Sequence, residues 1–257
     1  MLSNPTERFT GRVESYRRFR PGYPRAVGDL LRRECNLAPA SAVADIAAGT
    51  GIFTELLLDE GFSVTAVEPN SEMRTACKAL EERFPGLRVV SGTAEDTGLT
   101  GSSFELITVA QAMHWFDLDR TRTEFTRILK PGGACAVVYN NRRLAGDPFH
   151  DGYERLLLEF GIDYGAVKQQ HVGRKRLAGF FAPAPMHCAT VPNPQPLTLE
   201  ELEGRLLSSS YMPQPGHPRF QAMRAAIEQL FAETQSGGTV TMHHDCLVCR
   251  GQLRPLH

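Results

Sequence analysis

Residues 41–70, SAVADIAAGTGIFTELLLDEGFSVTAVEPN, decide the fold predicted for this chain. Apolar residues flank Asp45 on both sides between Val43 and Ala47, as expected for a parallel strand buried on both faces. Gly49-Thr50-Gly51 follows and lets the backbone turn tightly near a ligand, because neither glycine carries a Cβ atom. A helical pattern from Ile52 to Glu60 and a strand-like run from Ser63 to Val67 complete a right-handed βαβ unit. The stretch therefore predicts an α/β protein with a parallel sheet.

The end of the second strand indicates what this unit binds. Glu68 follows that strand, and a carboxylate there can accept hydrogen bonds from both hydroxyls of a ribose. A dinucleotide site would have a third glycine where Thr54 stands, and Asp45 would repel a pyrophosphate but suit an ammonium group. We therefore predict S-adenosyl-L-methionine, a nucleoside with a cationic amino-acid part, as the cofactor. The alternative is a glycine turn in another kind of α/β enzyme.

Length and composition restrict the classes of protein to consider. With 257 residues, 42% of them hydrophobic and 22% charged, the chain can bury the core of one large α/β domain. A net charge of −1 gives no bulk attraction to nucleic acid. No apolar run reaches the roughly twenty residues that span a bilayer, and the polar N-terminus has no hydrophobic signal segment. These features predict a cytoplasmic protein that acts on a small molecule, without a nucleic-acid or membrane partner.

The six cysteines are predicted to be reduced thiols rather than a disulfide framework, because they are scattered, mostly through predicted core elements. Cys246 and Cys249 follow His243-His244, a grouping of residue types that bind zinc. However, residues three apart in a regular strand face opposite sides of the sheet, and the chain has no second C-x-x-C pair. We therefore expect no metal site.

Two later loops follow predicted strands, at the sheet edge where open α/β proteins bind ligands. The first loop follows the strand Leu87–Val90, and its amides near Ala94, with a carboxylate from Glu95 or Asp96, can hold an adenine edge. The second loop, 111–116, follows the strand from Phe104 to Ala110 and contains a histidine beside the only tryptophan of the chain. A lone histidine is more often structural, but this one is expected beside the reacting group.

Five segments resemble one family, the Rossmann-like S-adenosylmethionine-dependent methyltransferases of the broad type 11 set. Asp45, Gly49 and Gly51 resemble its first motif, with one extra residue between the acid and the first glycine. Thr93-Ala94-Glu95 resembles its adenine loop, with Thr93 replacing the usual acid. AQAMHWFD (110–117) matches the stretch after its fourth strand, LKPGG (129–133) resembles its turn before the fifth strand, and RPGYP (20–24) is similar to a segment of trans-aconitate methyltransferase-like proteins. The resemblance is strong from about Ser41 to Arg143 and weaker elsewhere.

The resemblance implies methyl transfer from the sulfonium of the cofactor, and it implies a role for each matching residue. His114 is the candidate general base, and the acceptor could be an oxygen, nitrogen or carbon nucleophile. The candidate substrate-pocket residues are Trp115, Tyr16, Asn140 and Arg142. The candidate cofactor-binding residues are Asp45, Ala47, Gly49, Thr50, Gly51, Glu68, Pro69, Thr93, Ala94, Glu95, Asp96, Ala110, Gln111, Arg20 and Tyr23.

The predicted fold is a doubly wound, mostly parallel seven-stranded sheet with an antiparallel last strand, helices on both faces and a helical cap. One domain covers 1–257, with a cofactor-binding half at 41–140, a strap and substrate cap at 1–40 and 141–235, and a closing strand at 236–257. Helices are expected over Leu118–Leu129, capped by Asp119, over Phe149–Phe160, over Leu197–Ser210 with a Thr198/Glu201 capping box, and over Phe220–Ala232. The segment Gly161–Gln195 looks irregular apart from a short apolar piece at Met186–Val191, and strands are expected at Ala134–Tyr139 and Thr239–Cys249.

Three other functions are compatible with this pattern. A nicotinamide-dependent oxidoreductase is disfavoured by Thr54 and Asp45. A nucleoside-binding module without turnover would share the site, and a nucleic-acid methyltransferase would differ in its acceptor. We expect a monomer or homodimer.

Overall fold

The computed structural model of the protein describes residues 17–165 and 173–253. Seven strands form one sheet in the order β3-β2-β1-β4-β5-β7-β6. Strands β1 (Ala42–Ile46), β2 (Ser63–Val67), β3 (Arg88–Val90), β4 (Phe104–Ala110) and β5 (Leu129–Arg142) run parallel, while β7 (Val240–Gln252) is antiparallel to both β5 and β6 (His187–Leu197). This arrangement confirms the predicted doubly wound sheet with an antiparallel last strand.

Helices cover both faces of the sheet, as the buried apolar residues of the parallel strands require. On one face, α2 (Arg25–Glu34) and α3 (Ile52–Asp59) pack on strand residues such as Val43 and Leu106. On the other face, α5 (Leu118–Ile128) and α8 (Arg174–Phe181) pack on residues such as Ile107. The short helices α4 (Ser71–Lys78), η1 (Ala79–Glu82) and η2 (Met113–Trp115) complete the connections.

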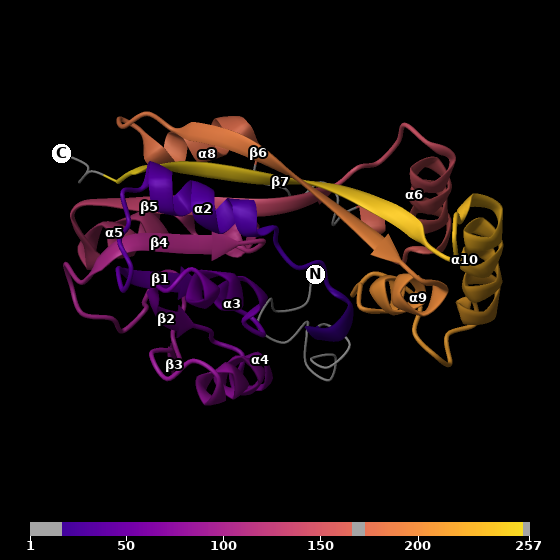
Figure 1. Ribbon diagram of the computed structural model, residues 1–257, viewed down its shortest axis with the longest axis horizontal. Helices are drawn as coiled ribbons and strands as arrows, with labels where there is room; N and C mark the ends of the chain where they lie inside the picture. Colours follow the sequence, from indigo (N-terminus) through magenta and orange to yellow (C-terminus); the bar gives the residue numbers. More distant parts are fainter. Residues whose placement is uncertain (1–16, 166–172, 254–257) are drawn as a thin grey trace.

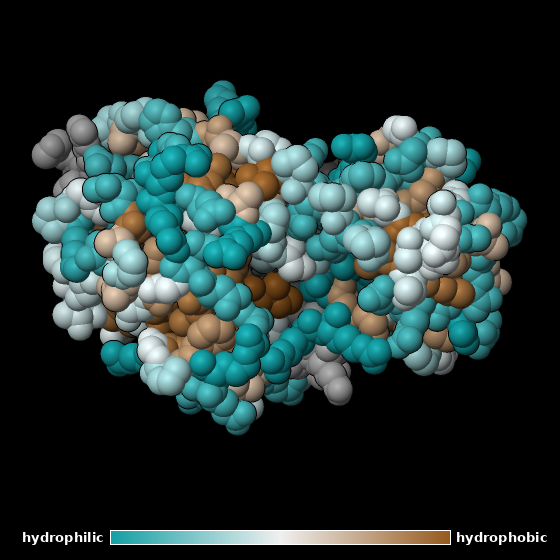
Figure 2. Space-filling model, in the orientation of Figure 1, coloured by the Kyte–Doolittle hydropathy of each residue, from teal (hydrophilic) through white to brown (hydrophobic). Residues whose placement is uncertain are grey.

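A second, smaller lobe lies beside this sheet lobe (Figure 1). We call it the cap lobe: helices α6 (Pro148–Phe160), α9 (Leu199–Leu207) and α10 (Phe220–Thr234), with the adjoining ends of β6 and β7. Its own core joins Leu202, Ile227 and other apolar residues of these helices to Leu197 and Met242 of the two strands. Figure 2 shows the narrowing between the two lobes. The long β6–β7 pair connects the lobes, because its strands belong to the sheet at one end and to the cap core at the other.

Two sequence predictions about the cap region hold. Thr198 accepts a hydrogen bond from the Glu201 amide, and the Glu201 side chain accepts one from the Thr198 amide, so the predicted capping box is present. The helices predicted at Phe149–Phe160 and Phe220–Ala232 are α6 and α10, which differ from the prediction only at their ends.

Other expectations are wrong. The side chain of Asp117, not Asp119, accepts the first amide hydrogen bonds of α5. The segment expected to be irregular contains α8 and most of β6, and the fifth strand is longer than predicted. The cysteines are not all reduced thiols: Cys188 and Cys249 face each other across β6 and β7 and form a disulfide.

Candidate active site

A cavity of about 570 Å³ lies where the carboxyl ends of β1, β4 and β5 face the cap lobe. Its wall is built from the strap (residues 20–24), the turn after β1, the loop after β4, the end of β5 and side chains of the cap lobe. Ligands of open α/β sheets bind at this edge, and the volume is in the range of small-molecule sites.

Most predicted site residues line this cavity. Tyr16 lies outside the described residues, and Gly51, Glu68, Pro69 and the loop Thr93, Ala94, Glu95 and Asp96 do not belong to the wall, although they lie at the same edge of the sheet. The predicted residues on the wall are Arg20, Tyr23, Asp45, Ala47, Gly49, Thr50, Ala110, Gln111, His114, Trp115, Asn140 and Arg142.

The glycine turn has an unusual backbone on the side that faces the cavity. Gly49 has φ of 60°, and a Cβ added to it would meet no atom within 4 Å. Ala47 also has a positive φ of 55°, although it is not a glycine. Non-glycine residues adopt this conformation at an energetic cost, and such residues cluster at functional sites. Gly51, at φ 88°, serves packing instead, since a Cβ there would approach Leu80 to 2.7 Å.

Asp45 is a buried carboxylate at the centre of the sheet edge, with 1% of its surface exposed. It accepts hydrogen bonds from the hydroxyls of Thr54, at 2.6 Å, and Thr108, at 2.8 Å. Burial raises the pKa of Asp45 to about 6, although both hydroxyls oppose this, and nearby Glu68 adds to the rise. A cation in the cavity would stabilise the ionised form.

Glu68 is fixed against the glycine turn. Its two carboxylate oxygens accept hydrogen bonds from the amides of Gly49 and Asn70, each at 2.8 Å. Burial raises the pKa of Glu68, whereas the two amides and the charge of Arg74 lower it. Each carboxylate oxygen has a second lone pair, so these contacts still allow hydrogen bonds from a sugar.

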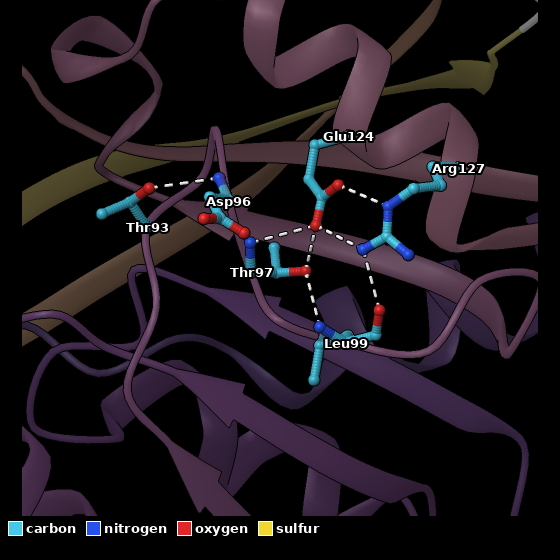
Figure 3. A network of polar contacts seen from close by, with 6 residues as sticks. All are labelled: Thr93, Asp96, Thr97, Leu99, Glu124 and Arg127. Atoms are coloured by element: carbon cyan, nitrogen blue, oxygen red, sulfur yellow. Dashed lines mark hydrogen bonds and ion pairs between the residues drawn. The ribbon is translucent and has the colours of Figure 1, made fainter.

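The loop that follows β3 is fixed by a polar network (Figure 3). Glu124 of α5 accepts hydrogen bonds from the amide and hydroxyl of Thr97 and from Arg127, which also donates to the Leu99 carbonyl. The Asp96 amide donates to the Thr93 hydroxyl at 3.2 Å. Glu95 accepts a hydrogen bond from the Asp117 amide at 3.0 Å. Asp96, the other acid of this loop, does not make that contact.

The loop after β4 places its ring side chains against the cavity. The His114 ring lies 4.6 Å from that of Trp115 and 6.4 Å from that of Tyr139, measured between centroids. Gln111 has a positive φ of 61°, and its side-chain amide donates to the Asn140 carbonyl of β5. The positive φ seen at Ala47 therefore recurs on the same cavity wall after β4, the strand next to β1.

The strap lines the cavity and is held at several points. The Gly22 carbonyl accepts hydrogen bonds from the side-chain amides of Asn140, at 3.1 Å, and Asn193, at 2.9 Å. The Tyr23 ring packs edge-on against Phe53 of α3 at 4.8 Å. The Arg20 guanidinium donates to the Ser208 carbonyl in the cap lobe, at 3.1 Å. The strap thereby joins the sheet lobe, the cap lobe and the cavity.

The cap lobe contributes wall residues that no sequence motif indicated. One of them, Tyr164, is hydrogen-bonded to both members of the ion pair between Glu154 and Arg142, the predicted wall residue at the end of β5. Arg205 lies on the face of α9 that also carries the buried Leu202 and Leu206. An arginine on the apolar face of a helix was the one signal in the sequence that could have indicated Arg205 as a site residue. The other cap residues on the wall are Tyr153, Ser209, Ser210, Tyr211, Met242 and His244.

Residues 17–165 and 173–253 contain neither a metal-binding cluster nor a membrane-spanning helix. No described group of three or more His, Cys, Asp or Glu side chains is arranged to hold a metal ion. No described helix has the length and apolar character needed to cross a membrane.

Comparison with known proteins finds similarity in the central part of the chain. Residues 44–137 match the family described as "Methyltransferase domain". An uncharacterized methyltransferase of Mycobacterium tuberculosis is 39% identical over 134 residues, which are 52% of each chain. Demethylmenaquinone methyltransferase of Renibacterium salmoninarum is 28% identical over 121 residues, 47% of this chain and 49% of that protein. This chain thus matches about half the length of its curated relatives.

Solved structures share the fold over most of the chain. A protein described as a type II methyltransferase from Anaeromyxobacter dehalogenans superimposes with a TM-score of 0.67 at 24% identity, covering 93% of this chain and 100% of that one. Geranyl diphosphate C-methyltransferase from Streptomyces coelicolor gives 0.51 at 14% identity, covering 89% and 77%. At these identities the likeness concerns the fold alone.

Proposed function

We propose that this chain, in which residues 44–137 match a methyltransferase family and lie on a seven-stranded sheet, transfers a methyl group from S-adenosyl-L-methionine to a small molecule. The observation that carries the proposal is the combination of an open Gly49 turn with the buried acids Asp45 and Glu68 at one sheet edge. The proposal covers the whole chain as one domain, in which the strap covers the cofactor and the cap lobe serves the acceptor.

The side chains present fit such a cofactor. Gly49 leaves open space where a side chain would project. The Thr50 hydroxyl is buried on the cavity wall with no hydrogen-bond partner among the described residues. Asp45 would face the cationic amino-acid part, Glu68 the ribose, and the loop 93–96 the adenine. Arg20 and Tyr23 of the strap would cover the amino-acid end.

The chemistry requires little covalent participation from the protein. The cofactor supplies a methyl group bonded to a positively charged sulfonium sulfur. Because of this charge, the thioether that departs when the methyl group is transferred is already a good leaving group. The residues of the chain therefore bind, orient and exclude water, and this positioning provides most of the acceleration. His114 would accept a proton from an alcohol, phenol or amine acceptor, whereas an acceptor ionised at pH 7 needs no base.

The acceptor is proposed to be a small molecule because the cavity is bounded by the strap and the cap lobe. The similarity of residues 20–24 to trans-aconitate methyltransferase-like proteins concerns the strap, so we propose no particular acceptor from it. We propose a cytoplasmic location and a monomeric or homodimeric state. The free thiols Cys35, Cys77, Cys135 and Cys246 support this location, whereas the Cys188–Cys249 disulfide argues against it.

Native mass spectrometry of the purified protein tests the proposal, followed by screening of a metabolite extract for release of S-adenosylhomocysteine. We expect a complex with S-adenosylmethionine or its product, and product release with a fraction of the extract. Binding without release by any fraction would favour a nucleoside-binding module. Binding of NADH instead would favour an oxidoreductase, and release only with tRNA would favour a nucleic-acid enzyme.

A further inference from the structure

The two ends of the cavity carry opposite charges. Asp45 lies at the sheet end, where β1 finishes. Three guanidinium groups, those of Arg20, Arg142 and Arg205, line the part toward the cap lobe. The cofactor proposed above brings a cation to the acidic end, and Arg20 is proposed to cover its amino-acid part. Arg142 and Arg205 then remain for the acceptor.

Arg205 differs from Arg142 in how its charge is compensated. The Arg142 guanidinium has an ion pair with Glu154, and both side chains are largely buried. Arg205 is only 8% exposed, and its hydrogen bonds go to neutral groups. Its Nε donates to the Phe19 carbonyl, and its Nη2 donates to the Gln195 side-chain oxygen at 2.8 Å. No carboxylate of the described residues forms an ion pair with it.

The third polar contact of Arg205 is weak. Its Nη1 lies 4.0 Å from the Met242 sulfur, and a thioether is a poor acceptor. A guanidinium has N–H groups on both terminal nitrogens, so Nη1 and Nη2 retain donors for a ligand in the cavity. Such a planar pair matches the two oxygens of a carboxylate or phosphate.

A buried cation with no directly paired carboxylate is energetically costly. Burial lowers the pKa of Arg205 to about 10, and the charge of Arg20 adds to this decrease, whereas Tyr153 and the charge of Glu201 oppose it. Burial also lowers the pKa of His244 to about 3, with the charges of Arg205 and Arg142 contributing, so this neighbouring wall residue is neutral. An anion bound here would restore the missing charge.

We infer that the methyl acceptor carries an anionic group, a carboxylate or a phosphate, which binds to Arg205. The inference rests on the proposed methyl transfer. The neighbouring wall residues Tyr153, Tyr211, Trp115, Leu144 and Met242 suit an apolar or aromatic body behind that anion. The acceptor class is therefore an amphiphilic organic acid.

Fluorescence of Trp115 provides the test, because it is the only tryptophan of the chain and lies on the cavity wall. The protein, saturated with S-adenosylhomocysteine, is titrated at constant ionic strength with pairs of aromatic and aliphatic carboxylic acids and their primary amides. Phenyl phosphate and benzyl alcohol form a further pair. We expect acids of at least one pair to bind about tenfold more tightly than the matched neutral compound, as for a charge-assisted bidentate contact. The carboxylate and phosphate pairs show which anion is preferred.

Three variants test whether Arg205 is the source of the preference for acids. Arg205→Gln should reduce the acid preference to within twofold, and Arg205→Lys should leave an intermediate one. Arg224→Gln, an exposed ion-pairing arginine of α10 outside this cavity, should retain the full preference. If the glutamine variant does not fold, the lysine variant decides alone: an unchanged preference in it would overturn the inference.

Further outcomes separate this inference from the proposed function. Arg205→Gln should bind S-adenosylhomocysteine within about twofold of wild type by calorimetry. A large loss would assign Arg205 to the carboxylate of the cofactor and overturn the inference. Cofactor binding by the wild type with no acid preference in any pair would also overturn it, while leaving methyl transfer intact. Failure of the wild type to bind the cofactor would remove both proposals.

Discussion

Gly49 and Gly51 have the same left-handed backbone, but their surroundings differ. A side chain at Gly49 would project into open space on the cavity wall, whereas one at Gly51 would press on Leu80 and Cys77. The first glycine therefore leaves room for a ligand, and the second allows α3 to pack near α4. A sequence motif cannot distinguish these two roles, because each position is simply a glycine in it.

Gly49→Arg should abolish binding of S-adenosylhomocysteine, because the new side chain would occupy the cofactor space. The positive φ adds about 1 kcal/mol of strain. Gly132→Arg is a matched control, since Gly132 also has a positive φ and open surroundings but lies in the turn within β5. Calorimetry should show no binding for the first variant and normal binding for the second. Micromolar affinity in Gly49→Arg would remove this turn from the site.

Asp45→Asn should make the free protein more stable at pH 7.5 and weaken cofactor binding about tenfold or more. The pKa of Asp45 is about 6 when folded, against an ordinary value of 3.8, so ionisation between these values opposes folding. The variant should gain about 1–3 kcal/mol above pH 6, and this gain should vanish below about pH 4, where the wild-type group is protonated in both states. Thermal unfolding across this pH range and calorimetry give both quantities. A less stable variant with unchanged affinity would contradict the assigned role.

The sequence alone predicted the site residues of the glycine turn but not those of the cap lobe. Asp45 and Gly49 lie within one continuous βαβ unit, whose pattern fixes where each residue falls. Arg205 and His244 come to the cavity only because β6 and β7 extend into the cap lobe. That arrangement depends on contacts between distant segments, which local spacing does not specify.

At the scale of elements, β6 explains the largest prediction error. Its sequence contains Pro192, Pro194 and Pro196, which are normally excluded from a sheet interior. The strand lies at the edge and pairs only with β7, and alternate residues direct their nitrogen to the same side. The missing N–H groups can therefore all face away from β7. The central strands β1, β2 and β4 were predicted correctly because both of their faces are apolar.

Glu124→Gln should destabilise the protein by about 2–3 kcal/mol at pH 7. Burial would raise the pKa of Glu124, but Arg127 and Thr97 outweigh it and lower the pKa to about 2. Its contribution is complete above its ordinary value of 4.5 and is lost as the pH falls toward 2. The difference in urea stability between wild type and variant should therefore narrow between pH 4.5 and pH 3.

Glu200→Gln is the control for that experiment, since Glu200 forms an ion pair with Arg18 in which both side chains are well exposed. It should change stability by no more than about 0.5–1 kcal/mol. Equal effects of the two substitutions would contradict the role of the network in Figure 3.

Asn193→Ala should release the strap, because it removes a donor to the Gly22 carbonyl and another to the Asn140 side chain. We expect a loss of about 1–2 kcal/mol in stability. Backbone amides of Arg20, Gly22 and Tyr23 should exchange hydrogen faster, and cofactor affinity should fall several-fold. Asn193 does not line the cavity, so any loss of affinity acts through the strap or through Asn140, which does line it. Unchanged exchange would show that the remaining donors to Gly22, Asn140 and Gln195, are sufficient anchors.

At the scale of the whole molecule, the two lobes divide the site. The sheet lobe supplies the glycine turn and the two acids, and the cap lobe supplies Arg205 and the aromatic wall. The strap connects them through Gly22 and Arg20. The narrowing seen in Figure 2 lies between these lobes. In this account cofactor chemistry belongs to the sheet and acceptor choice to the cap.

The most direct test of the central claim is a crystal structure with S-adenosylhomocysteine bound. We predict the ribose hydroxyls within hydrogen-bond distance of Glu68, the amino-acid part between Asp45 and Gly49, and the sulfur facing the cavity near His114. A ligand bound elsewhere, or a Glu68 carboxylate that makes no contact with the sugar, would contradict the account.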